Sequence, residues 1–215
     1  MARVSLAYPK MANSARAPME RCVAFEKYDG SNLHWVWERE LGWYAFGTRR
    51  DRFDLDEVGI AEFAHAHPEL EQAPLMFQHE LLESLTQILQ RCEFFQSEEL
   101  TVFTEFLGEN SFAGRHVHAD PKRLVLFDVE TAHGFLSPWE FVEHFASLPI
   151  ARVVYDGKLT GPFIENVRAG RFDVAEGVVC KGGETGQVWM AKIKTHAYEQ
   201  RLKEAFNNRW EQFWE

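Results

Sequence analysis

A lysine two residues before an Asp-Gly pair, between runs of β-forming residues, constrains this chain more than any other feature. The segment is Phe25-Glu26-Lys27-Tyr28-Asp29-Gly30-Ser31-Asn32. Asp-Gly favours a tight turn because glycine adopts backbone angles that other residues resist. Residues 33–38 are rich in aromatic and branched side chains and predict a strand. We therefore expect Lys27 at the mouth of a strand-turn-strand unit, facing a cleft.

A lysine amine becomes a nucleophile only when its proton is destabilised, by a dry pocket or by nearby positive charge. The alternative is a surface lysine beside an ordinary hairpin, because four loosely defined positions such as Lys-x-Asp-Gly recur by accident. The order of the other charged residues along the chain has to decide between the two interpretations.

The composition permits one sizeable core and excludes binding that depends on overall charge. The chain has 215 residues, 46% of them hydrophobic, and a formal net charge of −10. Any nucleic-acid binding must therefore depend on a local cluster of Lys and Arg. Cys22, Cys92 and Cys180 form no CxxC pair, so neither a zinc knuckle nor a disulfide framework is expected.

The sequence carries no signal for export or for a membrane. Residues 1–6 lack a continuous apolar segment, and no stretch approaches the length of a membrane span. We therefore expect a protein of the reduced cytoplasm that has no membrane partner. Without an internal repeat or a low-complexity linker, residues 1–215 are expected to form a single domain.

Short apolar runs separated by turn residues predict antiparallel strands. The first begins at residues 22–25, and residues 43–48 are expected to pair with the 33–38 strand through a turn at Gly42. A polar, glycine-bearing loop over residues 109–116 is expected at the rim of a cleft. Further strands are predicted over residues 99–108, 123–129, 175–181 and 188–194.

Apolar residues at three- and four-residue spacing predict helices outside these strands, which makes the expected fold α+β. The main helix is predicted over residues 74–92, a second over 137–147 and a terminal amphipathic helix over about 196–215. Three irregularly spaced histidines are expected to be surface or capping residues rather than metal ligands: His65, His67 and His79.

Charged residues occur at the ends or on the faces of several predicted strands. Arg49 follows the 43–48 strand, and Glu105 lies in an apolar strand, where a buried carboxylate is costly without a cation or a donor. Lys192 and Lys194 share one face of the last strand, and adjacent ammonium groups either face water or bind an anion. Each has an alternative interpretation. Arg49 could be a solvated strand end, Glu105 could be an edge glutamate that faces water, and the two lysines could guard an exposed strand edge.

The order of these motifs resembles the covalent nucleotidyltransferase superfamily of ATP-dependent polynucleotide ligases and capping enzymes. Asn32, five residues after Lys27, and the Lys192-Ile193-Lys194 ending make the chain most similar to the RNA ligase 2 family. The resemblance spans about residues 22–196. The ordered motifs are Lys27-x-Asp29-Gly30, Arg49, Glu105, Leu126-Phe127-Asp128, Glu176-Gly177-x-Val179-x-Lys181 and Lys192-x-Lys194.

The resemblance implies a nucleotidyltransferase fold, an ATP-grasp-like ligase adenylation domain whose antiparallel sheets form a nucleotide cleft. Lys27 would attack the α-phosphate of ATP and hold AMP through a phosphoramidate bond. Glu26 would read the adenine edge, and Asn32 would lie near the ribose or a metal-bound water. Arg49 would contact the nucleotide sugar or the incoming 5′-phosphate end.

The remaining motif residues would surround the nucleotide. By the same resemblance, Glu105 would bind the ribose hydroxyls, Phe127 would stack on adenine, and Glu176 is the candidate metal ligand. Three lysines would surround the phosphates: Lys181, Lys192 and Lys194.

The implied chemistry requires ATP and Mg²⁺, or Mn²⁺ as a substitute, because phosphoryl transfer depends on alignment and charge neutralisation. The cations around Lys27 are expected to keep its amine unprotonated. AMP would be loaded onto Lys27, moved to a 5′-phosphate end and released when a 3′-hydroxyl attacks. The expected partners are RNA ends or a nicked RNA duplex.

The sequence departs from its relatives after the last lysine motif. Polynucleotide ligases generally carry a second domain there, whereas residues 195–215 alone follow Lys194. We therefore expect a single adenylation domain without a second C-terminal domain. It would act as a minimal ligase or with a partner protein that supplies the missing domain, or the chain is a piece of a longer one.

Two rival interpretations stay open. Within the enzyme class, the chain could seal DNA nicks or transfer guanylyl groups as capping enzymes do, because the shared motifs do not show the substrate. From another class, it could be a nucleotide- or RNA-end-binding module without catalysis. A binder has no need of a nucleophilic lysine, so the joint presence of five motif residues argues against it: Lys27, Glu105, Glu176, Lys192 and Lys194.

Overall fold

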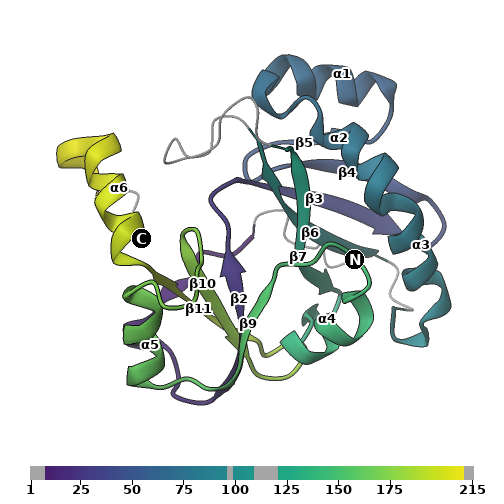
Figure 1. The fold of residues 1–215 in the computed structure, drawn as a ribbon. Helices are drawn as coiled ribbons and strands as arrows, with labels where there is room; N and C mark the ends of the chain where they lie inside the picture. The colour runs from purple at the N-terminus through teal and green to yellow at the C-terminus, as the bar shows by residue number, and fades with distance from the viewer. Residues whose placement is uncertain (1–7, 96–98, 109–120, 211–215) are drawn as a thin grey trace.

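Two sheets, built almost entirely of antiparallel strand pairs, form the framework of the protein (Figure 1). The computed structural model describes residues 8–95, 99–108 and 121–210. The five-stranded sheet has the order β1-β11-β10-β2-β9, and the six-stranded sheet has the order β5-β4-β3-β6-β7-β8. The predicted α+β fold with antiparallel sheets is therefore confirmed. The predicted loop over residues 109–116 lies outside the described residues.

The strands follow the apolar runs of the sequence closely. The five-stranded sheet contains β1 (Ala12–Asn13), β2 (Arg21–Lys27), β9 (Val153–Lys158), β10 (Gly177–Gly182) and β11 (Trp189–Lys194). The six-stranded sheet contains β3 (Ser31–Glu38), β4 (Gly42–Thr48), β5 (Arg52–Asp54), β6 (Glu99–Leu107), β7 (Arg123–Thr131) and β8 (Gly134–Phe135).

The Asp29-Gly30 pair passes the chain from one sheet to the other and does not close a hairpin. β2 pairs with β9 and β10, whereas β3 pairs with β4 and β6. Gly30 has no positive φ. It is needed for space, because a Cβ there would collide with the carbonyl oxygen of Phe106 and lie 2.8 Å from Leu107 Cδ2. Lys27, at the end of β2, therefore lies where the two sheets meet.

Helices cover one face of the six-stranded sheet through an aromatic core. Trp35 of β3 stacks on Phe77 with ring centroids 3.9 Å apart, and both side chains are fully buried. The predicted 74–92 helix is interrupted by a π-helical turn that separates α2 from α3, which the three- and four-residue spacing does not reveal. The helices here are α1 (Glu57–Ala66), α2 (Ala73–Met76), the π turn (Phe77–Leu81) and α3 (Leu82–Arg91).

A second, smaller core lies between the five-stranded sheet and α5 (Gly161–Arg168). Phe163 and Val167 of α5 pack there against strand residues such as Val178. The predicted helix over 137–147 is α4 (Pro138–Phe145), and Ser137 and Glu140 form the expected capping box at its start. Phe141 of α4 contacts Phe25 of β2 with ring centroids 5.8 Å apart.

The last helix, α6 (His196–Phe206), follows β11 directly and projects beyond the sheets (Figure 1, yellow). The sequence predicted it to about residue 215, but it ends at Phe206 because Asn207 has a φ of 46°, outside the helical region. Residues 211–215 lie outside the described part of the chain. Among the described residues, no helix is long and apolar enough to span a membrane.

Candidate active site

A cavity of about 480 Å³ opens at the junction of the two sheets, a size typical of small-molecule sites. β2 and β10 contribute one side, and β3, β6 and β7 contribute the other. Most of the residues singled out in the sequence line this cavity: Glu26, Lys27, Asn32, Arg49, Glu105, Phe127 and Lys181. The cavity therefore brings together residues that are far apart in the chain.

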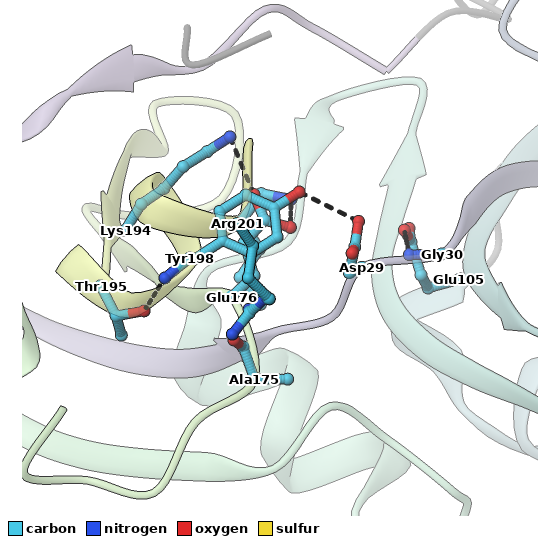
Figure 2. A network of polar contacts seen from close by, with 10 residues as sticks. Asp29, Gly30, Glu105, Ala175, Glu176, Lys194, Thr195, Tyr198 and Arg201 are labelled. Carbon is cyan, nitrogen blue, oxygen red and sulfur yellow. Dashed lines mark hydrogen bonds and ion pairs between the residues drawn. The ribbon is translucent and has the colours of Figure 1, made fainter. Parts of the chain in front are cut away.

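Lys27 lies in an ion-pair chain at the cavity wall. Its Nζ is 2.7 Å from Glu176 Oε2. Figure 2 shows the other ion pair of this carboxylate, in which Lys194 Nζ is 3.0 Å from Glu176 Oε1. The Lys27 side chain is 22% exposed, whereas those of Glu176 and Lys194 are 3% and 8% exposed. One buried carboxylate thus forms ion pairs with two ammonium groups. Of these three residues, Lys27 alone lines the cavity.

The prediction that neighbouring cations keep Lys27 unprotonated is wrong for this state of the protein. Burial lowers the pKa of Lys27, but the carboxylates of Glu176, Glu105 and Asp29 together outweigh it, and the pKa lies above its ordinary value. The carboxylates act more strongly than the lysines because Glu176 is in direct contact with Nζ. The amine therefore has to lose its proton during a reaction.

Asn32 of β3 and Glu105 of β6 lie directly beside each other on neighbouring strands, because their Cα atoms are register partners. The Gly30 N–H donates a hydrogen bond of 3.1 Å to Glu105 Oε1 (Figure 2). Burial raises the pKa of Glu105 to about 7, although Lys27 opposes the shift. The buried Oδ1 of Asn32 has no hydrogen-bond partner among the described residues. This wall of the cavity therefore offers polar oxygen atoms to a ligand.

Lys181 is held against the opposite wall by a buried polar cluster. Its Nζ donates to the Phe127 carbonyl oxygen at 2.7 Å and to Asp128 Oδ2 at 2.8 Å. The Tyr8 hydroxyl donates to the same Asp128 oxygen at 2.7 Å. Burial lowers the pKa of Lys181, and Asp128 opposes the shift. The half-buried Phe127 ring lines the cavity beside this lysine, which suits the stacking role predicted for it.

Glu26 is fixed by a residue that the sequence did not single out. Arg152 Nε donates to Glu26 Oε2 at 2.8 Å, and the Ala175 N–H donates to Glu26 Oε1 at 3.3 Å. Arg152 also donates to the Asp173 carbonyl oxygen at 2.8 Å. The Glu26 carboxylate therefore has a fixed direction at the cavity, and its predicted contact with adenine stays a prediction.

Lys192 and Lys194 do not line the main cavity. They line a second hollow of about 150 Å³ together with Arg168 at the end of α5. Burial, reinforced by the charges of Lys194 and Lys27, lowers the pKa of Lys192 to about 8. The three predicted phosphate-binding lysines therefore lie in two places, Lys181 in the cavity and the other two in the hollow.

The structure adds residues that sequence reasoning missed. His67 is the C-terminal capping residue of α1, which agrees with the sequence prediction, but it also lines the cavity with Arg49 and Arg50, and its Nε2 lies 3.2 Å from Asp51 Oδ2. Tyr198 of α6 donates a 3.0 Å hydrogen bond to Asp29 Oδ1 (Figure 2). Nothing in the local sequence marks either contact, because each joins separate elements.

The donor set fits a metal ion that arrives with a substrate. Among the described residues, no group of three or more His, Cys, Asp and Glu side chains could hold a metal ion by itself. Mg²⁺ is commonly held by one or two carboxylates together with substrate phosphates and water. Glu176 supplies a carboxylate in contact with Lys27 Nζ, and the unpartnered amide oxygen Oδ1 of Asn32 belongs to a residue that lines the same cavity as Lys27. The residues present therefore suit such an ion.

Two solved structures with the same fold were found by structural comparison. One is an RNA ligase variant from Naegleria gruberi with ATP and Mn, at a TM-score of 0.62 and 16% identity over 94% of this chain and 60% of that chain. The other is an archaeal ATP-dependent RNA ligase, at a TM-score of 0.58 and 16% identity over 94% of this chain and 52% of that chain. This chain thus spans only 52–60% of the length of those two.

Sequence comparison gives the family. No curated protein sequence matches the chain. The family model described as RNA ligase, however, matches residues 20–194. That span covers both sheets except β1 and includes every site residue predicted from the sequence, from Glu26 to Lys194. The chain therefore belongs to the RNA ligase family.

Proposed function

We propose that this chain is an ATP-dependent RNA ligase, or its adenylyltransferase core, in which Lys27 carries AMP to a 5′-phosphorylated RNA end. The observation that carries the proposal is the position of Lys27 at a cavity of about 480 Å³ with its Nζ 2.7 Å from Glu176. Family membership over residues 20–194 supports it. A solved relative of the same fold is described with ATP and Mn.

In the first step, Lys27 Nζ forms a bond to the α-phosphorus of ATP, and the bond from that phosphorus to the bridging oxygen breaks to release pyrophosphate. The ammonium group must give up its proton beforehand. Glu176 Oε2 is the nearest acceptor, at 2.7 Å. Glu105 and Asn32 face the ribose, Phe127 faces the base, and Lys181 neutralises phosphate charge from the other wall.

In the second step, an oxygen of the RNA 5′-phosphate forms a bond to the α-phosphorus, the P–N bond breaks, and Lys27 regains a proton. In the third, a 3′-hydroxyl attacks the RNA phosphorus, a phosphodiester forms and AMP leaves. A bound divalent ion supplies charge neutralisation at the phosphates. Glu176 and Asn32 are the residues that would hold it.

We also propose that residues 1–215 act as one adenylation domain, with sealing assisted by a further domain or a partner protein. The loading step needs only the cavity and Lys27, so it is the step expected of this chain alone. Sealing needs RNA ends to be held in register, and the ligases it resembles are longer. Loading and sealing should therefore be measured separately.

The test is the mass of the intact protein after incubation with ATP and Mg²⁺. We expect an added adenylyl group on the wild type, lost on acid treatment and absent from Lys27→Ala. Lys158→Ala, which removes an exposed lysine of β9, should retain the adduct. A folded wild-type protein that gains no nucleotide would refute the proposal and leave a binding module.

The same assay separates the rival substrates. GTP in place of ATP tests guanylyl transfer, and a guanylyl adduct without an adenylyl adduct would contradict the proposal. Sealing trials on nicked RNA, nicked DNA and single strands then distinguish RNA from DNA ligation. We expect product with RNA ends in preference to DNA ends, and preferential sealing of nicked DNA would be the contrary result.

A further inference from the structure

A histidine and a carboxylate form a hydrogen-bonded pair at the edge of the cavity, beside the turn between β4 and β5. His67 lines the cavity, and its Nε2 lies 3.2 Å from Asp51 Oδ2. The Thr48 hydroxyl donates to the other carboxylate oxygen of Asp51, and the Thr48 N–H donates to the Asp51 carbonyl oxygen at 3.1 Å. Residues 48–51 therefore form a closed turn, and His67 is joined to it from the end of α1.

The His67 ring has a fixed position. Its centroid lies 5.0 Å from that of Phe63 and 6.1 Å from that of Phe53, and 22% of the side chain is exposed. The turn lies close against β4, because a Cβ on Gly47 would collide with the Asp51 carbonyl oxygen. The imidazole and its carboxylate partner are thus held in place by two different elements.

A neutral imidazole in this arrangement offers a hydrogen-bond acceptor. A carboxylate partner favours the tautomer in which Nε2–H donates, so that Nδ1 carries the lone pair. Arg49 and Arg50 line the cavity beside His67, and guanidinium groups offer donors only. An ionised phosphate has no proton to donate to Nδ1, whereas a hydroxyl group has one. The edge of the cavity therefore combines donors that suit phosphate with an acceptor that suits a hydroxyl group.

The order of the strands places this edge beyond the nucleotide expected in the cavity. The six-stranded sheet contains the order β7-β6-β3-β4, and Phe127, Glu105 and Asn32 lie on the first three of these strands. In the roles proposed for them, Phe127 faces the base and the other two face the ribose. Since neighbouring strands are about 4.8 Å apart, the end of β4 lies one strand beyond the ribose, on the side away from the base. A hydroxyl group that reaches His67 therefore belongs to another nucleotide.

We propose that His67, held by Asp51, accepts a hydrogen bond from a ribose 2′-hydroxyl of the RNA strand and so makes the cavity selective for RNA over DNA. The 2′-hydroxyl is the group by which a protein distinguishes the two nucleic acids at a given position. This inference rests on the proposed function, because the strand enters the cavity to receive AMP from Lys27. Asp51 is a positioning residue, since it acts through the ring of His67.

The experiment measures the dissociation constants of a short 5′-phosphorylated RNA and of DNA of the same sequence by fluorescence anisotropy, without a divalent ion. We expect the wild type to prefer RNA. His67→Ala should reduce this preference about five-fold by weakening RNA binding alone, as loss of one hydrogen bond does. His65→Ala is the matched control, because His65 is an exposed histidine of α1 that does not line the cavity. It should keep the wild-type preference.

Two conservative substitutions separate recognition of the RNA from support of the turn. In His67→Gln, the side-chain amide can occupy the position of Nε2 and contact Asp51. In His67→Asn, the amide can occupy the position of Nδ1. We expect His67→Gln to lose the preference for RNA and His67→Asn to keep more of it. The opposite order would show that His67 only supports the turn, and it would overturn the proposal.

Ligands that lack one hydroxyl group identify the nucleotide concerned. RNA with a single 2′-deoxynucleotide should bind the wild type more weakly at one position of the strand, and His67→Ala should show no further loss at that position. The rate of Lys27 adenylylation from 2′-deoxy-ATP, relative to ATP, should be the same in the wild type and in His67→Ala. A changed ratio would assign the hydroxyl group to ATP and contradict the proposal.

The two proposals fail in different measurements. Equal affinities of the wild type for RNA and DNA, or an unchanged preference in His67→Ala, would refute the role of His67 alone. A wild type that never gains an adenylyl group on Lys27 would refute the proposed function, and the preference for RNA would still be judged by its own constants.

Discussion

Lys27, Glu176 and Lys194 form the residue pattern on which the proposed chemistry depends. Glu176 has both oxygen atoms in ion pairs, and its side chain is almost fully buried. In the protein without substrate, Lys27 is therefore protonated. Burial lowers its pKa, but three carboxylates outweigh that effect, and the pKa lies above its ordinary value. Binding of ATP with a divalent ion would redistribute these charges and release the amine.

Glu105→Gln is expected to change how stability depends on pH. Burial raises the pKa of Glu105 from 4.5 to about 7. A carboxyl group with a raised pKa in the folded state binds its proton more tightly there, so its stabilising contribution is complete below about pH 4.5 and is lost as pH rises through about 7. Between about pH 5 and about pH 8, the unfolding free energy of the wild type should fall relative to Glu105→Gln by on the order of 2 kcal/mol.

Urea unfolding at the two pH values measures this difference. Glu62→Gln, at an exposed position of α1, is the matched control and should follow the wild type at both pH values. A difference between the wild type and Glu105→Gln that does not change with pH would contradict a raised pKa at this carboxyl group.

Arg152→Ala is expected to weaken nucleotide binding without unfolding the protein. Arg152 orients the Glu26 carboxylate through a 2.8 Å hydrogen bond, and loss of that contact leaves the carboxylate less firmly oriented, although the Ala175 N–H still donates to it. We expect the dissociation constant of AMP, measured by calorimetry, to rise about five-fold. Arg21→Ala removes an exposed arginine paired with Asp156 in the same sheet and should leave the constant unchanged. Equal constants for the two variants would show that Glu26 needs no orientation.

Among the elements, α6 connects the two sides of the site. Tyr198 donates to Asp29 at the junction of the sheets, and Arg201 donates to the Ala175 carbonyl oxygen at 2.8 Å, next to Glu176 (Figure 2). The Thr195 side chain begins the helix by accepting from the Tyr198 N–H at 3.1 Å. The helix after the last lysine motif therefore holds both carboxylate-bearing segments in place.

Tyr198→Phe tests this role of α6. The substitution keeps the ring and removes the buried hydroxyl donor. In the wild type this hydroxyl stays protonated, because burial raises the pKa of Tyr198. We expect the unfolding free energy to fall by about 1 kcal/mol. Tyr155→Phe removes a hydroxyl that donates to the Lys158 carbonyl oxygen at the surface and should cost less. If both variants unfold at the same urea concentration as the wild type, α6 does not hold the junction.

For the whole molecule, the site exists because two sheets meet at Gly30. The cavity takes its lining from both sheets, and the chain passes between them at a glycine that lies against the β6 backbone. The larger core contains Val23 and Phe25 of the five-stranded sheet together with residues of the six-stranded sheet, so it joins the two sheets at this junction, whereas the smaller core lies between the five-stranded sheet and α5. The junction is therefore the point where a small change in packing alters the site.

Gly30→Ala is expected to lower the unfolding free energy by about 1–3 kcal/mol, as overpacking does, and to slow adenylylation of Lys27. The added Cβ would meet the Phe106 carbonyl oxygen, which is backbone and cannot rotate away. Gly161→Ala is the control, because a Cβ there has no atom within 4 Å. If Gly30→Ala proves as stable and as reactive as Gly161→Ala, the account of the junction is contradicted.

Local features of the sequence predicted much of the fold. The apolar runs and the Gly42 turn, whose φ is 72°, lie where the pattern placed them. The π turn over Phe77–Leu81 was missed because a single inserted residue leaves the three- and four-residue spacing almost unchanged. The end of α6 at Phe206 was missed because it depends on the backbone of one asparagine.

The sequence motifs predicted several of the residues that line the cavity, but not the contacts that these residues make. The ordered motifs placed Lys27, Glu105 and Phe127 at one cavity. The protonation of Lys27 depends on Glu176, which is 149 residues away, and local sequence does not show which charge lies nearest. For the same reason, Arg152 looked like any charged residue until the fold placed it beside Glu26.

The most direct test of the central claim is to locate the adenylyl group in the chain. Wild-type protein treated with ATP and Mg²⁺ is digested, and the peptides are sequenced by tandem mass spectrometry. We predict an adenylyl group on Lys27 through an acid-labile bond and on no other lysine. An adenylyl group on another residue such as Lys192, or its persistence in Lys27→Ala, would contradict the account.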